Sequence, residues 1–345
     1  EIKSNTPISI KKALKGGAVL SPDAFYQFAL VNGKEAYAIN LNDALINENI
    51  ILPVGSDLRI YNKEEYLSLV TENPNKSTDP SVAKLVNAKN LAEIYLDGKR
   101  IAYVPISQNQ NFRETLSNFY TPGADTIFDI ALIDNGSVIK AIDLKDEIGK
   151  QNLDLLSIGS KLLIFENKFY NDLLSYDNDL LSYDTLNISN PTIENESEDA
   201  EVKSAEALLI EIEIDKEKED YLDKINFSRK MLKQANLINI KLDGKMFTFI
   251  PFTEGTSSLD AIKKLRKKLP KLISEFVVVQ NKDVGKTPEI KNLNYPFEIS
   301  LGEEVNFISR ENYRLIIKNY KNGSVSNLLS DLKSSNAVEV YYDGK

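Results

Sequence analysis

Short apolar runs separated by glycine-containing turns dominate this chain of 345 residues. In the segment 91–170, two apolar runs flank Asp97-Gly98 and two more flank Asn135-Gly136. Asp-Gly and Asn-Gly are the pairs that tight hairpin turns prefer, because glycine adopts the positive φ that these turns require. The pattern therefore predicts two β-hairpins in this segment.

One helix and a last strand complete the segment. Phe112, Leu116 and Phe119 recur at the spacing of one helical face, and an apolar run follows the turn at Gly159. The resulting order is strand–strand–helix–strand–strand–strand. It predicts an α+β fold in which a small sheet is covered by one helix, a β-grasp-like unit.

The same pattern recurs along the chain. The strings "AEIYLDGK", "INIKLDGK" and "VEVYYDGK" each have an Asn seven residues before the Asp, at positions 90, 236 and 336. A second block keeps eleven residues between a glycine and a tyrosine, in Gly55–Tyr66, Gly159–Tyr170 and Gly302–Tyr313. Because the blocks recur in the same order, the sequence predicts tandem copies of one unit.

The repeat predicts a division of the chain into units and connections. The expected units are the C-terminal part of a first unit at 1–70, a second at 91–170, a third at 236–316, and the first strand of a truncated fourth at 336–345. Helices are expected to connect them at 71–90, 221–235 and 317–335.

One interval between blocks is much longer than the others. The separation from the block glycine to the next Asp-Gly-Lys aspartate is 42 residues after Gly55 and 84 after Gly159. The extra stretch, 171–206, has ten acidic residues and one Lys, a net charge of −9 that equals the charge of the whole chain. Such a segment buries too little apolar surface to fold alone, which predicts an acidic flexible insert at 171–220. Ca²⁺ binding is the alternative, although the stretch lacks the glycine and glutamate spacing of an EF-hand loop.

The composition removes several classes of function. The chain has no Cys and no His, so it has no disulfide, no thiolate nucleophile and no histidine general base. No glycine-rich phosphate loop occurs, and no apolar run reaches the roughly 20 residues that span a bilayer. We therefore expect no enzymatic activity, no catalytic residue, no cofactor, no metal site and no transmembrane segment.

A basic stretch is the strongest polar candidate for binding. The segment "SLDAIKKLRKKLPKLI" concentrates Lys263, Lys264, Arg266, Lys267 and Lys268, which could hold an acidic polymer. A solvated outer face of a helix is the favoured interpretation. Nucleic acid is not expected, because no other basic surface with interleaved aromatic residues accompanies this stretch.

The turn residues form the other candidate set. Hairpin and turn chemistry explains them, and a shared ligand contact is the less favoured alternative. These predicted structural positions are Asp97, Gly98, Asp243, Gly244, Asn135, Gly136, Gly55, Gly159 and Gly302.

Two stretches resemble a known family. "AINLNDALINENIILPVGSDLRIY" and "AIDLKDEIGKQNLDLLSIGSKLLIF" are similar to the end of the SLBB domain (soluble ligand-binding β-grasp), which has a polar "DL" segment followed by "LxxGDxIxV". The chain departs from that pattern where Ser56, Ser160 and Glu303 replace the Asp after the glycine. SLBB domains occur in tandem in outer-membrane polysaccharide export proteins.

The resemblance implies a function without chemistry. It points to a periplasmic protein associated with the outer membrane, whose units self-associate into a ring or scaffold that contacts a capsule polysaccharide or exopolysaccharide. Two alternatives remain open at this point. One is a soluble ligand- or glycan-binding module, and the other is an extracellular repeat that acts as a spacer or adhesin.

Overall fold

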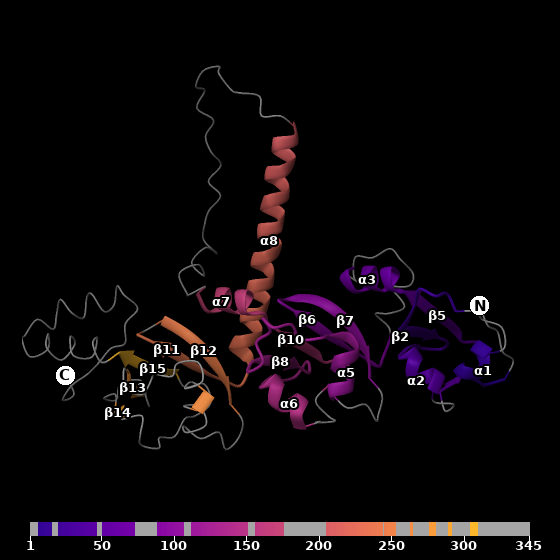
Figure 1. Cartoon of the computed structure of the whole chain (residues 1–345), viewed down its shortest axis with the longest axis horizontal. Helices are drawn as coiled ribbons and strands as arrows, with labels where there is room; N and C mark the ends of the chain where they lie inside the picture. Colours follow the sequence, from indigo (N-terminus) through magenta and orange to yellow (C-terminus); the bar gives the residue numbers. More distant parts are fainter. Residues whose placement is uncertain are drawn as a thin grey trace, which may run out of the picture.

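The chain folds into three units in a row, with one long helix standing away from them (Figure 1). The first two units contain helices and strands, and the described elements of the third are strands. The computed structural model describes residues 6–15, 20–46, 50–72, 88–106, 112–150, 156–175, 205–243, 245–252, 263–264, 276–280, 289–291 and 304–309. We call the three parts unit 1 (6–72), unit 2 (88–175) and unit 3 (236–309). The α+β class predicted from the sequence is confirmed.

Unit 2 contains a five-stranded mixed sheet. Its elements are β6 (Leu91–Leu96), β7 (Lys99–Pro105), α5 (Phe112–Phe119), β8 (Ala131–Asp134), β9 (Ile139–Ile142), α6 (Leu144–Lys150), β10 (Lys161–Ile164) and α7 (Asn167–Ser175). The strand order is β7-β6-β10-β8-β9. The central pair β6 and β10 is parallel, and the other neighbours are antiparallel.

Unit 3 has the same sheet topology. Its strands are β11 (Leu237–Leu242), β12 (Lys245–Pro251), β13 (Phe276–Gln280), β14 (Glu289–Lys291) and β15 (Glu304–Ser309), in the order β12-β11-β15-β13-β14. Here too the central pair, β11 and β15, is parallel. The first hairpins even share an irregularity, because the register shifts between Ile94 and Tyr95 in one and between Ile240 and Lys241 in the other.

Unit 1 repeats the second half of this arrangement. Its elements are β1 (Ile8–Ser9), α1 (Ile10–Lys15), β2 (Ala24–Asn32), β3 (Ala36–Ile39), α2 (Leu41–Ile46), β4 (Ile51–Leu52), β5 (Asp57–Asn62) and α3 (Lys63–Thr71). The order β3-β2-β5 matches β9-β8-β10 of unit 2. Helices α1 and α2 occupy the places of α5 and α6 in the chain order.

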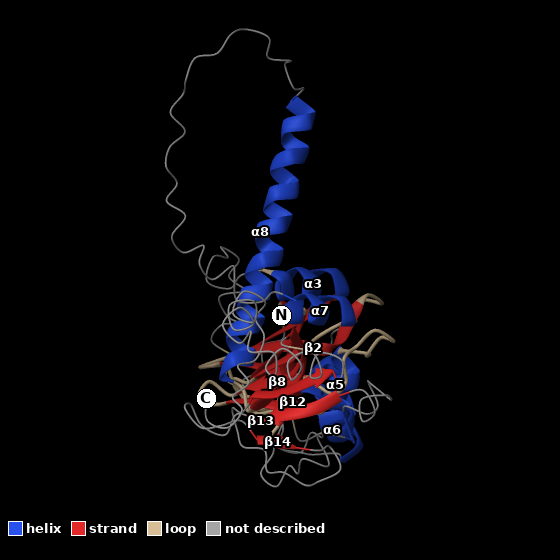
Figure 2. Cartoon of the chain, turned by 90° about the vertical axis from the view of Figure 1, so that its left-hand side faces the viewer, coloured by secondary structure: helices blue, strands red, loops and turns tan. Residues whose placement is uncertain are grey.

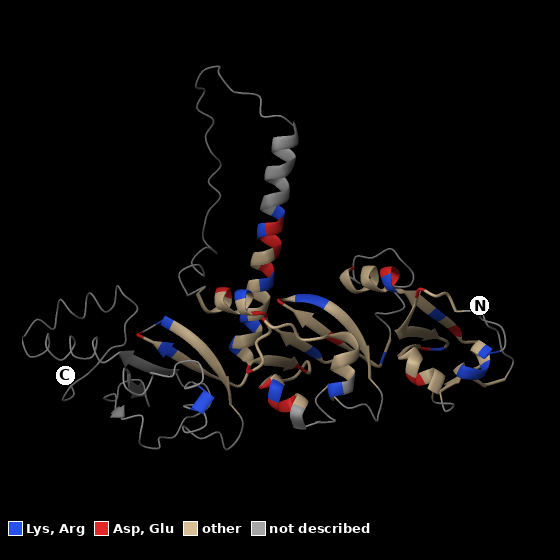
Figure 3. Ribbon diagram, in the orientation of Figure 1, with Lys and Arg blue, Asp and Glu red and all other residues tan. Residues whose placement is uncertain are grey.

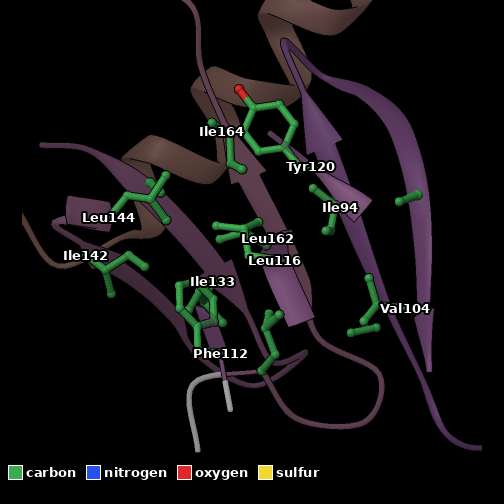
Figure 4. Close-up of a cluster of buried hydrophobic side chains, with 14 residues drawn as sticks. Ile94, Val104, Phe112, Leu116, Tyr120, Ile133, Ile142, Leu144, Leu162 and Ile164 are labelled. Atoms are coloured by element: carbon green, nitrogen blue, oxygen red, sulfur yellow. The ribbon is translucent and has the colours of Figure 1, made fainter. Parts of the chain in front are cut away.

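Each sheet of units 1 and 2 has an apolar core on both faces. On one face of unit 2, Phe112 and Leu116 of α5 pack over Ile94, Ile133 and Leu162 (Figure 4). The other face is covered by α7 and by α8 (Ala205–Gln234), which contributes Ile225, Met231 and Leu232. Alternate strand residues therefore face two cores, which explains why the strands are apolar almost throughout.

Helix α8 stands out from the row of units in two perpendicular views (Figures 1 and 2). Its 30 residues correspond to about 45 Å of helix at 1.5 Å per residue. Above the sheets, residues 216–220 of α8 are exposed and carry charges of both signs (Figure 3). No helix among the described residues is long and apolar enough to cross a membrane.

Several predicted boundaries are corrected by the structure. The insert predicted at 171–220 is helical at both ends, because Asn171 to Ser175 belong to α7 and the stretch from Ala205 belongs to α8. The connecting helix predicted at 221–235 is thus the C-terminal half of a longer helix. Most of the connecting helix predicted at 71–90 lies outside the described residues, and α3, which the sequence did not predict, ends at Thr71 where that helix was expected to begin. The connection at 317–335 and the strand at 336–345 lie outside the described residues.

The unit predicted from the sequence has one helix, whereas units 1 and 2 each contain two further helices. The polar "DL" segments form α2 and α6, because the side chains of Asn40 and Asp143 accept hydrogen bonds from the backbone N–H groups of Asp43 and Asp146 and so cap the helices. Helices α3 and α7 follow the last strands. In α3, Asn62 and Glu65 form a reciprocal capping box.

Candidate functional site: the joints between units

At each joint between neighbouring units, each of the two units contributes one side chain that bonds the backbone of the other. The residues occupy the same repeat positions at both joints. At joint 1, between units 1 and 2, the Asn90 side chain bonds the backbone of Ala38 on edge strand β3. Its Oδ1 accepts from the Ala38 N–H at 2.8 Å, and its Nδ2 donates to the Ala38 carbonyl at 2.5 Å. Asn90 is buried, so this primary amide takes the place of a neighbouring strand for one residue of an otherwise open sheet edge.

The second joint, between units 2 and 3, repeats this contact. The Asn236 Oδ1 accepts from the N–H of Ala141 on edge strand β9, at 2.5 Å. Asn236 stands where Asn90 does in the repeat, and Ala141 stands where Ala38 does. The amide nitrogens differ, because Asn236 Nδ2 donates to the Phe252 carbonyl of its own unit. We call this recurring contact the asparagine latch.

A tyrosine reaches across each joint in the opposite direction. The Tyr66 hydroxyl of α3 accepts from the Tyr103 N–H at 3.2 Å and lies 3.3 Å from the Tyr103 carbonyl, to which it donates. At joint 2, the Tyr170 hydroxyl of α7 accepts from the Phe249 N–H at 3.1 Å and lies 3.0 Å from the Thr248 hydroxyl. Tyr103 and Phe249 both stand six residues after the turn aspartate, on edge strands β7 and β12. We call this contact the tyrosine latch.

The two latches are reciprocal. The following unit supplies the asparagine to the edge strand of the preceding one, and the preceding unit supplies the tyrosine to the edge strand of the following one. Each joint therefore covers two open sheet edges, which would otherwise present unpaired backbone groups.

Apolar side chains fill the joints beneath the latches. At joint 1, Leu91 and Tyr103 of unit 2 pack into a cluster with Phe28, Leu30 and Leu69 of unit 1. At joint 2, the equivalent residues Leu237 and Phe249 pack against Leu132 and Leu173, with the Tyr170 and Phe249 rings 6.4 Å apart. The joints are thus continuous with the cores of the units, and burial of this apolar surface stabilises them.

Burial at the joints also determines how the tyrosines titrate. Desolvation raises the pKa of Tyr66 and Tyr170 well above the usual value of 10, because a buried phenolate loses its hydration. The same cause raises the pKa of Tyr103 to about 12. The latches therefore require neutral phenols.

Joint 1 has an additional arginine clamp. Arg100 of β7 donates to the carbonyls of Val70 and Glu72 at the end of α3, at 2.9 and 2.5 Å. It also pairs with Glu93 at 3.3 Å and lies over the Tyr103 ring. The last carbonyls of a helix have no intrahelical partner, so the guanidinium satisfies two of them. Met246 occupies the equivalent place at joint 2.

Joint 2 instead has α8 against the first turn of unit 2. The turn has the left-handed backbone expected of an Asp-Gly pair, with φ values of 51° at Asp97 and 74° at Gly98. The Asp97 carboxylate accepts from the Glu166 N–H at 2.9 Å, and desolvation raises its pKa. A Cβ on Gly98 would lie 2.9 Å from the Cβ of Lys224, so α8 covers this turn closely.

The remaining turn candidates lie at exposed ends of the sheets. Gly55, Gly136 and Gly159 have φ values of 78°, 81° and 80°, and nothing lies within 4 Å of a Cβ built on them. The loop around Asn135-Gly136 has four residues, because Asp134 pairs with Ile139. Asp243 repeats the positive φ of Asp97. Gly244 and Gly302 lie outside the described residues.

The basic candidates are only partly within the described residues. The structure describes Lys263 and Lys264, whereas Arg266, Lys267 and Lys268 lie outside the described residues. The Lys264 ammonium lies 3.3 Å from the carboxylate of Asp143, the residue that caps α6 of unit 2. This lysine therefore adds an ion pair to joint 2. Because both side chains are partly exposed, the pair contributes at most about 1 kcal/mol.

The joints can hold units together, and their chemistry is that of hydrogen bonding and burial. In the part of the chain that the structure describes, no three acidic side chains gather into a possible metal site. Sequence reasoning identified the recurrence of Asn90, Asn236, Tyr66 and Tyr170. It favoured packing in the core or between units for the tyrosines, but it named no partner for any of the four. Their constant spacing was the available signal, because a polar residue that recurs beside apolar strands needs a buried partner.

The comparisons with known proteins leave the family open. No family model matches the chain, and no curated protein sequence matches it.

Alkaline pH is expected to open the joints. The folded state holds the phenolic protons of Tyr66 and Tyr170 more tightly than the unfolded state, so their stabilising effect is complete below pH 10 and is lost as the pH rises further. We expect the free energy of unfolding in urea to fall as the pH is raised above 10, while the absorbance at 295 nm rises as phenolate forms. In Tyr66→Phe the fall should be shallower. Equal slopes in both proteins would contradict the assignment of this titration to the latch.

Proposed function

We propose that this chain is a non-enzymatic repeat region of a polysaccharide export protein, located in the periplasm at the outer membrane. In this proposal its units build part of an oligomeric channel or scaffold, and a capsule polysaccharide or exopolysaccharide is the polymer that the assembly contacts. The role of the chain is mechanical.

The recurring joint is the observation that carries the proposal. Units 2 and 3 share one strand order, and the latches of joints 1 and 2 use equivalent residues. A chain that uses equivalent polar side chains to hold successive units in the same way is suited to extended assembly. This supports a scaffold over a module that acts through one ligand pocket.

The sheet supports the β-grasp part of the proposal. A mixed five-stranded sheet with a parallel central pair, entered by a hairpin and crossed by one helix, is the arrangement expected of a β-grasp unit. The "DL" segment and the glycine turn before β10 are the features that resemble SLBB domains. In this chain they form the cap of α6 and the turn at Gly159, which has a positive φ.

Self-association tests the proposal directly. Mass photometry of the chain over a range of concentrations, followed by electron microscopy of the largest species, should show a symmetric homo-oligomer with a closed ring. The asparagine-latch variant Asn90→Ala serves as a control for a disturbed scaffold. A strictly monomeric protein at every concentration would instead favour the alternative of a spacer within an extracellular repeat protein.

A further inference from the structure

The latches recognise backbone atoms of the neighbouring unit. The asparagine latch bonds the N–H group of an alanine, and the tyrosine latch bonds the N–H group of an aromatic residue. Backbone groups are present whatever the side chain. The contact therefore specifies the position of an edge strand and not its sequence.

The apolar contacts of the two joints also use the same kinds of side chain at the same repeat positions. Leu91 and Leu237 begin the first strand of their units, and Tyr103 and Phe249 present an aromatic ring at the same repeat position. On the preceding side, Ala38 and Tyr66 correspond to Ala141 and Tyr170. The bonds to the backbone N–H groups and the apolar contacts thus have counterparts at both joints. The Nδ2 bond of Asn90, the arginine clamp and the Lys89–Glu35 pair occur at joint 1 alone among the described contacts, and the Thr248 hydroxyl contact and the Lys264–Asp143 pair at joint 2 alone.

We infer that the surface of unit 1 formed by edge strand β3 and helix α3 is a general acceptor for units of this array, and that it binds unit 3 as it binds unit 2. In that joint, Asn236 would bond the backbone of Ala38, and Tyr66 would bond the backbone of Phe249. The inference concerns how units join, and it holds or fails independently of any polysaccharide.

Three differences predict how the new joint departs from joint 1. Lys89 pairs with Glu35 at joint 1, and unit 3 has Ala235 in the place of Lys89. Arg100 clamps the end of α3, and unit 3 has Met246 in that place. Lys264 pairs with Asp143, and unit 1 has the neutral Asn40 at that position. The joint between units 1 and 3 is therefore expected to form with less stability than joint 1.

A deletion tests the inference in one chain. Removing residues 88–233 takes out 146 residues, which is the distance from Asn90 to Asn236, so Asn236 moves into the place of Asn90. Residue-resolved hydrogen exchange should show the Ala38 amide slowed by about 100-fold relative to an open joint, the effect of a buried hydrogen bond. Adding Asn236→Ala to the deletion should remove that protection. An Ala38 amide that exchanges at the open rate, while Leu30 and Ile240 remain protected, would overturn the inference.

A second variant keeps the test informative if the shortened chain does not fold. Arg100→Met with Tyr103→Phe gives joint 1 of the full chain the side chains that unit 3 has at the clamp and at the aromatic position. We expect the Ala38 amide to retain most of its protection, with exchange rising by less than about tenfold for loss of the clamp. Exchange at the rate measured in Asn90→Ala would show that the joint depends on the replaced side chains and would overturn the inference.

Discussion

Gly98→Ala is expected to destabilise the chain by about 2–5 kcal/mol and to release α8 from unit 2. Two effects add. A residue with a Cβ costs about 1–2 kcal/mol at a left-handed φ, here 74°, and overpacking costs about 1–3 kcal/mol more. The overpacking arises because the new Cβ would lie 2.9 Å from the Lys224 Cβ and 3.1 Å from the Lys224 carbonyl oxygen. Urea denaturation followed by far-UV circular dichroism measures the loss.

Gly136→Ala is the matched control for this prediction. Gly136 has a similar φ of 81°, but nothing lies within 4 Å of a Cβ built there. It should therefore show only the backbone cost of about 1–2 kcal/mol. Faster trypsin cleavage after Lys224 in Gly98→Ala alone would show that α8 has been released. Equal losses and equal cleavage in the two variants would mean that α8 does not pack on the turn.

Asn90→Ala is expected to cost about 2–4 kcal/mol, because it leaves the N–H and carbonyl of Ala38 buried without a partner. Asn236→Ala should cost less, about 1–3 kcal/mol, because only the Ala141 N–H loses its partner across the joint. The free energy of unfolding from urea titrations provides both values. Asn90→Ala is expected to cost more than Asn236→Ala because the amide nitrogen of Asn90 bonds across its joint, whereas that of Asn236 bonds within its own unit.

Asn135→Ala provides the exposed control for the asparagine variants. Asn135 lies in the loop between β8 and β9, and its side chain makes one long contact of 3.5 Å with Ser157. Such a surface substitution should change stability by less than about 0.5 kcal/mol. If Asn90→Ala were as harmless as this control, the asparagine latch would have no role in holding the units together.

The elements that could be predicted are those specified by residues close together in the sequence. The hairpin at Asp97-Gly98 and the helix carrying Phe112 and Leu116 depend on residues close together in the sequence, and the structure contains both. Helix α6 was missed because its seven residues are mostly polar and its start is marked only by the cap at Asp143. Helix α8 was placed too short because acidic composition outweighed its helix-forming Ala, Leu, Glu and Lys residues.

The joints could be predicted only in part, because their contacts are distant in sequence. Asn90 lies 52 residues from Ala38, and Tyr66 lies 37 residues from Tyr103. The repeat identified which residues recur, but a spacing along the chain does not say which edge strand receives a side chain. Only the strand order, which puts β3 and β7 at open edges, determines those partners.

Residue-resolved hydrogen exchange of the intact chain tests the central claim most directly. Four backbone amides, those of Ala38, Tyr103, Ala141 and Phe249, donate to a side chain of the neighbouring unit. If the latches join successive units, all four exchange slowly, and Asn90→Ala accelerates exchange at Ala38 while leaving Ala141 unchanged. Exchange of these four amides as fast as that of exposed loop amides without a hydrogen bond would contradict the account.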